Sequence, residues 1–75
     1  MQPKPERDAD KSYPLPAFIA KLRRLADALE RGERFEIQIA GERVAVPARA
    51  RCSIEHERQG ASEEIEFQLR WSNPQ

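Results

Sequence analysis

The sequence predicts an α+β domain in which one N-terminal helix packs on one face of a four-stranded antiparallel sheet. Apolar residues first recur at three- and four-residue steps, and the period then changes to two over four short runs separated by turn residues. A striped helix and one-sided strands each need an apolar partner, so together they form a two-layer core. The other sheet face can stay in water, because an antiparallel sheet tolerates this.

Length and composition restrict the function classes. A chain of 75 residues forms one domain of marginal stability, with about 60% of its surface buried on folding. The 13 basic and 13 acidic residues balance, so net charge gives no general attraction to nucleic acid or to anionic membranes. No apolar run of about 18 residues and no secretory signal are present, so we expect a cytoplasmic prokaryotic protein without a membrane segment.

The chain divides into three parts. Residues 1–13 are charged and contain two prolines, which predicts a disordered N-terminal arm. We prefer a solubilising leader to a docking tail for this arm. Residues 14–72 form the single α+β domain, and residues 73–75 form a frayed tail.

The helix is predicted over residues 16–31. Pro16 suits the first helical position, and Gly32 suits the C-terminal stop. One apolar stripe runs between them and consists of Phe18, Ile19, Leu22, Leu25, Ala26 and Leu29.

Four strands follow. The first two, around residues 35–39 and 43–46, are joined by Gly41-Glu42, which suits a type II′ hairpin turn. Pro47 ends the second strand or occupies its edge. Residues 49–57 and 63–71 form the third and fourth strands around a turn at 58–62. A meander is the default strand order, and an order with the first strand beside the fourth stays open.

Matching the inward faces of the last two strands predicts their register. Ile54 lies opposite Phe67, Cys52 opposite Leu69, and Ala50 opposite Trp71. Trp71 then caps the core at the strand end, with its N–H near the rim. Phe67 and Leu25 are the other structural residues in this interpretation. The less favoured alternative makes Trp71 a ligand platform.

The segments LRRLADALERG, IAGERVAVP and EIEFQLRW, in this order, resemble the amphi-Trp domain family, which is named for a final amphipathic strand ending in tryptophan. The resemblance covers about residues 15–71. It implies a small prokaryotic domain and supplies no catalytic motif, cofactor or substrate. The matching positions are Leu22, Leu25, Leu29, Gly32, Gly41, Val46, Pro47, Ile65, Phe67, Leu69 and Trp71.

The open face of the sheet is expected to be split by charge. Arg49, Arg51 and Arg70 gather at one end. Glu55 lies opposite Glu66, and Glu57 opposite Glu64, toward the 58–62 turn. This candidate interaction face consists of Arg49, Arg51, Arg70, Glu55 and Glu66.

No set of residues predicts catalysis or a metal site. Cys52 and His56 share a strand face but lie about 13 Å apart at ~3.3 Å per residue, too far to bind one metal or to form a thiol–imidazole pair. Cys52 is interpreted as a small core residue, and His56 as a strand-end residue. We therefore predict neither an enzyme nor a cofactor.

The favoured function is a small non-catalytic protein-interaction or accessory-subunit domain, acting through its charged sheet face or an exposed edge strand. The sequence does not name the partner, and a second copy in a weak homodimer is one candidate. The alternative is a nucleic-acid-binding accessory domain. It would use Arg23, Arg24, Arg49, Arg51 and Arg70, but the face lacks the stacking aromatics such binding needs.

Overall fold

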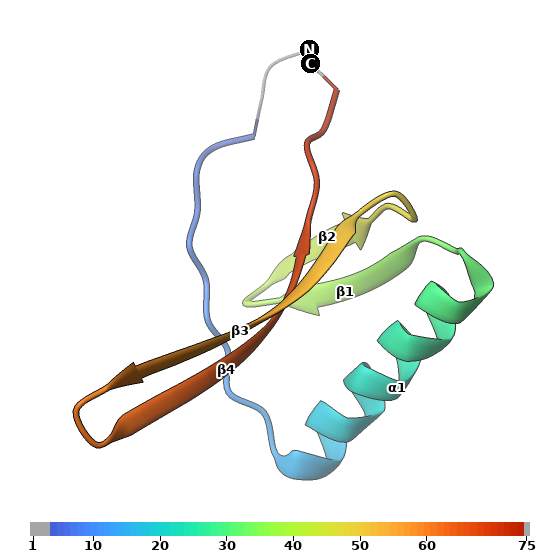
Figure 1. Cartoon of the computed structure of the whole chain (residues 1–75). Coiled ribbons are helices and arrows are strands. Elements are labelled where there is room, and N and C mark those ends of the chain that lie inside the picture. Colours follow the sequence, from blue (N-terminus) through green and yellow to red (C-terminus); the bar gives the residue numbers. More distant parts are fainter. Residues whose placement is uncertain (1–3, 75) are drawn as a thin grey trace.

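The computed structural model describes residues 4–74, which form one helix and four strands (Figure 1). The elements are α1 (Leu15–Arg31), β1 (Phe35–Ile39), β2 (Glu42–Val46), β3 (Arg51–Gln59) and β4 (Ser62–Arg70). The α+β class is confirmed. The prediction of one four-stranded sheet is wrong, because the strands pair as two separate antiparallel hairpins, β1–β2 and β3–β4.

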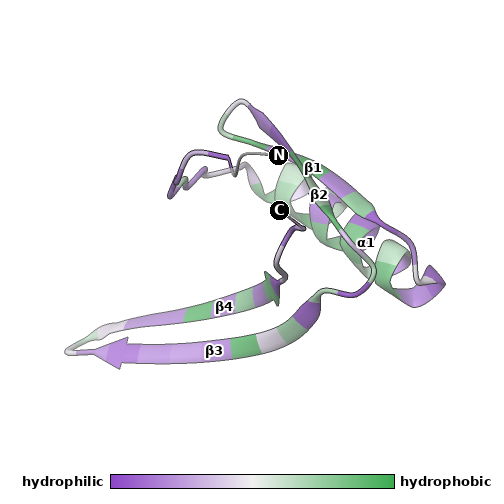
Figure 2. Cartoon of the chain, turned by 90° about the horizontal axis from the view of Figure 1, so that it is seen from above, coloured by the Kyte–Doolittle hydropathy of each residue, from purple (hydrophilic) through white to green (hydrophobic). Residues whose placement is uncertain are grey.

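The segment between β2 and β3 explains the separation. Pro47 has no amide hydrogen to continue a ladder. The Ala50 amide donates to the Pro47 carbonyl at 3.1 Å, which closes a turn and redirects the chain away from the edge of β2. The β3–β4 hairpin therefore extends away from the rest of the molecule (Figure 2).

Local chain chemistry sets the ends of α1. The Phe18 amide donates to the Pro14 carbonyl at 3.0 Å in the first turn. At the other end Gly32 adopts a φ of 65°, in the left-handed region. Its amide donates to Leu29 and the amide of Glu33 donates to Ala28, the paired bonds of a Schellman motif. The predicted end of the helix at residue 31 is confirmed.

The core of the described chain is small and lies on β1–β2. Phe35 and Val46 are directly paired across the two strands, and each is only 7% exposed. The helix packs on β1 through one flank, where its partly covered residues gather, and none of its residues is fully buried. These partly covered residues are Ala17, Lys21, Leu25 and Ala28.

Arg24 ties the helix to this core. Its guanidinium donates to the Glu36 carbonyl at 2.7 Å, and it lies over the Phe35 ring at 5.2 Å from the centroid. Arg24 remains exposed, and its long side chain reaches back to the strand that follows the helix.

The helix does not cover the β3–β4 hairpin as predicted. Phe67 is 66% exposed and Cys52 is also exposed, so neither is a core residue. Leu25 is partly covered, on the helix flank that packs on β1. The difference follows from the turn after Pro47, because the hairpin leaves the first sheet and its apolar face meets α1 only across an open cleft beside Leu25 and Leu29.

The register within β3–β4 is confirmed, including Ile54 opposite Phe67 and Cys52 opposite Leu69. The strands are shifted from the predicted bounds, and the expected Ala50 to Trp71 pair lies outside the ladder because Ala50 belongs to the preceding turn.

The β1–β2 turn also differs. Ile39 pairs with Glu42, so the central turn residues are Ala40 and Gly41, with φ of 47° and 84°. Two positive φ values indicate type I′ rather than the expected type II′ at Gly41-Glu42.

The chain before the helix runs beside β1. Arg7 donates to the Ile39 carbonyl at 2.7 Å, and the Tyr13 hydroxyl donates to Gln38 at 3.3 Å. Residues 1–3 of the expected arm and residue 75 of the expected tail lie outside the described residues, and disorder of the arm stays a prediction. Within residues 4–74, α1 is not long and apolar enough to cross a membrane.

Replacing Phe35 by alanine is expected to unfold much of the protein. Truncating a buried phenylalanine costs about 3–5 kcal/mol, which is comparable to the ~3–5 kcal/mol available to a domain of this size. The measurement is thermal unfolding followed by circular dichroism. The control Phe35→Leu keeps most of the volume and is expected to cost under about 1.5 kcal/mol. Equal melting of the two variants would contradict the assigned core.

Arg24→Ala is expected to lower the free energy of unfolding by about 1 kcal/mol, because it removes a carbonyl hydrogen bond and a cation–π contact. Arg23→Ala is the matched control, since Arg23 is exposed and makes no side-chain hydrogen bond or ion pair with residues 4–74. Urea unfolding of both variants measures the difference. A loss as large for Arg23→Ala would show that the helix is not held through Arg24.

Candidate functional site

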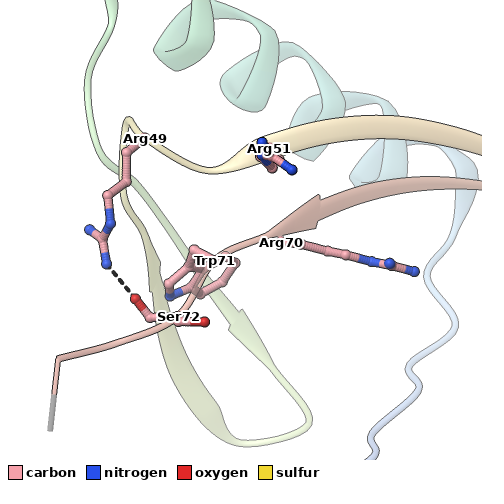
Figure 3. A pocket seen from close by; sticks show the side chains of 5 residues that line it. All are labelled: Arg49, Arg51, Arg70, Trp71 and Ser72. Carbon is pink, nitrogen blue, oxygen red and sulfur yellow. Dashed lines mark hydrogen bonds between the residues drawn. The ribbon is translucent and has the colours of Figure 1, made fainter.

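A basic cleft lies where β3 begins and β4 ends (Figure 3). It is an open depression of about 420 Å³, lined by Arg49, Arg51, Arg70, Trp71 and Ser72. Arg51 and Arg70 are direct partners in the ladder, while Arg49 comes from the turn before β3. The structure therefore brings together the three arginines that the sequence placed at one end of the charged face.

Two hydrogen bonds shape this cleft. The Arg49 guanidinium donates to the Ser72 carbonyl at 2.6 Å, which ties the turn before β3 to the chain after β4. The Trp71 indole N–H donates to the Asn73 side-chain oxygen at 3.0 Å. Both bonds fix the segment that leaves β4 and hold it beside the arginines.

Sequence reasoning did not anticipate Trp71 in the cleft. Strict alternation would put Trp71 on the face opposite Arg70, but the ladder ends at Arg70 and the chain after it is not bound by the strand period. The ring is half-buried and lines the cleft. The one sequence feature that indicated an end of the strand before Trp71 was Pro74, shortly after the tryptophan.

The positive charge of the cleft is not neutralised by residues 4–74. The ion pairs of this part of the chain involve other basic residues, and none reaches Arg49, Arg51 or Arg70. Arg51 and Arg70 also face each other directly, which is mildly unfavourable for like charges. An anionic group placed between them would relieve this repulsion, and guanidinium forks match carboxylate and phosphate geometry.

The same hairpin face is acidic toward its tip. Glu55 lies opposite Glu66 and Glu57 opposite Glu64, so the predicted charge split is confirmed. The side-chain amide of Gln68 donates to Glu55 at 2.8 Å and to Glu66 at 2.9 Å, which partly offsets their repulsion. The negative charge of Glu66 is the main cause of a raised pKa at Glu64.

Other candidate chemistry stays apart in the fold. Cys52 and His56 lie on one face of the continuous strand β3, and the His56 Nε2 contacts the Glu63 carboxylate at 2.9 Å. Within residues 4–74 no group of three His, Cys, Asp or Glu side chains is close enough to hold a metal ion.

Comparisons of the chain with protein-family models, with curated proteins and with solved structures give no match.

The acidic tip predicts a pH-dependent stability. The raised pKa means that folded Glu64 binds its proton more tightly than the unfolded chain does, so stability falls as pH rises above the ordinary value of 4.5. Glu64→Gln is expected to raise the melting temperature at pH 7 by about 1–2 °C, and to lose this advantage near pH 4. Melting curves at both pH values check this, with the helical Glu30→Gln as control. A gain that persists at the lower pH would contradict charge repulsion as the cause.

Proposed function

We propose that this chain is a small non-catalytic protein-interaction or accessory-subunit domain that binds its partner through the charged face of β3–β4. The supporting observation is the open cleft that Arg49, Arg51 and Arg70 line together with the half-buried Trp71, where none of the three forms an ion pair within residues 4–74. We further propose that it belongs with the amphi-Trp domains it resembles, that it acts in the cytoplasm of a prokaryote, and that it needs no cofactor.

The composition of the cleft favours a protein partner. Tryptophan and arginine are the residues most enriched among those that dominate protein interfaces. A carboxylate on an acidic segment would bind the Arg51 and Arg70 guanidinium groups, while its apolar neighbours contact the Trp71 ring.

The acidic tip of the hairpin would fix the orientation of the partner. A partner that carries basic residues beyond its acidic segment would meet Glu55 and Glu66, and two charge signs on one face select one alignment. The unpaired outer edges of β3 and β4 offer the partner main-chain hydrogen bonds as well.

Nucleic acid is the second candidate, because Trp71 supplies a ring beside the arginines on which a base could stack. It ranks lower for an electrostatic reason. Four glutamates occupy the rest of the same face and repel phosphate groups along the path of a strand.

Trp71 is the only tryptophan, so its fluorescence reports on the cleft directly. We expect titration with a glutamate-rich peptide to shift this emission, and a single-stranded oligonucleotide at ~50 mM salt to leave it unchanged. A response to the oligonucleotide alone would replace the protein-partner proposal by the second candidate. No response to either probe would contradict the cleft as a binding site for acidic groups.

Reversing Arg51 and Arg70 together to glutamate is expected to weaken peptide binding at least tenfold, about 1.4 kcal/mol. The control is Lys4→Glu with Lys11→Glu, which makes the same change in net charge far from the cleft in the sequence. Circular dichroism establishes that both double variants fold. Equal binding by the two would show that net charge, and not the cleft, determines affinity.

A further inference from the structure

We propose that two copies of this chain form a two-fold dimer in which α1 of each copy covers the apolar face of the other copy's β3–β4 hairpin. This goes beyond the proposed function, because it uses the hairpin face opposite to the charged one. It assigns a second copy as the partner for apolar surfaces that a single chain leaves in water.

The hairpin supplies the first of these surfaces. Ile54, Ile65 and Phe67 lie on one face and are 68%, 64% and 66% exposed. Ile54 and Phe67 border an open apolar cleft of about 260 Å³ with Leu25 and Leu29 of the helix, and both remain mostly exposed there. The rest of this face extends beyond the helix and has no layer over it (Figure 2).

The helix supplies the second surface. Its packing on β1 uses the flank that includes Leu25 and Ala28, and this leaves most of the apolar stripe outside the contact. Phe18, Leu22 and Leu29 are 50%, 41% and 42% exposed. The helix therefore has a free apolar face of its own, and a helix face and a sheet face are natural partners in a two-layer core.

The uncovered area fits a dimer. Eight large apolar side chains are between 38% and 68% exposed. At roughly 150–250 Å² for a full aromatic side chain and less for leucine or isoleucine, they leave on the order of 700 Å² in water, divided between the helix and the hairpin. This area is close to the ~800 Å² that each partner contributes to a standard protein interface.

Charge does not oppose a second copy as the occupant. Four of the five hairpin glutamates lie on the face away from the contact, and Arg58 is ion-paired with Glu63 on the apolar face. The chain as a whole has a net charge of zero, so no long-range repulsion opposes association.

Two-fold symmetry satisfies both surfaces at once. When the helix of the first copy lies on the hairpin of the second, the symmetry operation places the second helix on the first hairpin, and no apolar face is left over. The charged hairpin faces point away from both contacts. The dimer would present two basic clefts, which makes binding to a repeated partner bivalent.

Sedimentation equilibrium of the full chain measures the assembly. We expect a concentration-dependent mass that rises from 8.7 kDa to twice that value. A single mass of 8.7 kDa at chain concentrations up to ~1 mM overturns the proposal. The apolar faces would then be covered within one chain or by a different protein. A mass that grows beyond the dimer overturns the proposal too, since the two-fold arrangement is closed.

Two variants locate the contact. Phe67→Glu on the hairpin and Leu22→Glu on the helix are each expected to raise the dimer dissociation constant about 100-fold or more, because each places a charge in both symmetric contacts. Both sites are exposed in the single chain, so the variants should fold. The control Gln59→Glu adds the same charge on the opposite hairpin face and is expected to leave the dimer intact.

Mixing the two variants tests whether the helix of each copy covers the hairpin of the other. Neither forms its own dimer, but the mixed pair retains one contact between an unaltered helix and an unaltered hairpin. We expect mass measurement to detect mixed dimers, with differently tagged copies captured together. Failure of the mixture to associate would overturn the reciprocal arrangement even if the wild-type chain dimerises. The mixing experiment can still be interpreted if one variant folds only when it assembles.

Discussion

The contact between Phe35 and Val46 across β1 and β2 is the interaction on which the rest of the structure depends. They are the two buried apolar residues of the described chain, and the helix is held to them partly through Arg24, which binds the strand backbone and covers the Phe35 ring. A core this small explains the division of the molecule. It is enough to anchor one helix on one hairpin, but the helix and the second hairpin border an open apolar cleft and form no packed layer there.

The second hairpin is consequently defined by its own ladder and by its two contrasting faces. Its charged face places arginine opposite arginine and glutamate opposite glutamate, which costs stability in the isolated chain. Its apolar face costs more, because Ile54, Ile65 and Phe67 remain in water. Both costs would be recovered on association, by anionic groups at the arginines and by an apolar layer over the other face.

The two proposed surfaces are therefore compatible. The dimer would use the apolar side of β3–β4 and the stripe of α1, and the basic cleft around Trp71 would remain open for a further partner. The hydrogen bonds from Arg49 to Ser72 and from Trp71 to Asn73 hold that cleft within a single chain, so its shape does not depend on assembly.

The sequence alone determined the elements, because local rules decide them. Pro16 in the first turn and Gly32 after the last turn mark the helix to within one residue, the two-residue alternation marks each strand, and the shared apolar face of Ile54 and Phe67 sets the register of the last hairpin. The charge split on that hairpin follows from the register and was predicted with it. The tertiary structure decided which elements touch. Pairing between hairpins depends on the direction the chain takes after Pro47, and a periodic pattern shows that a face is apolar without showing what covers it. For the same reason Phe67 was expected in the core, and the place of Trp71 beside the arginines was visible only once the strand was seen to end at Arg70.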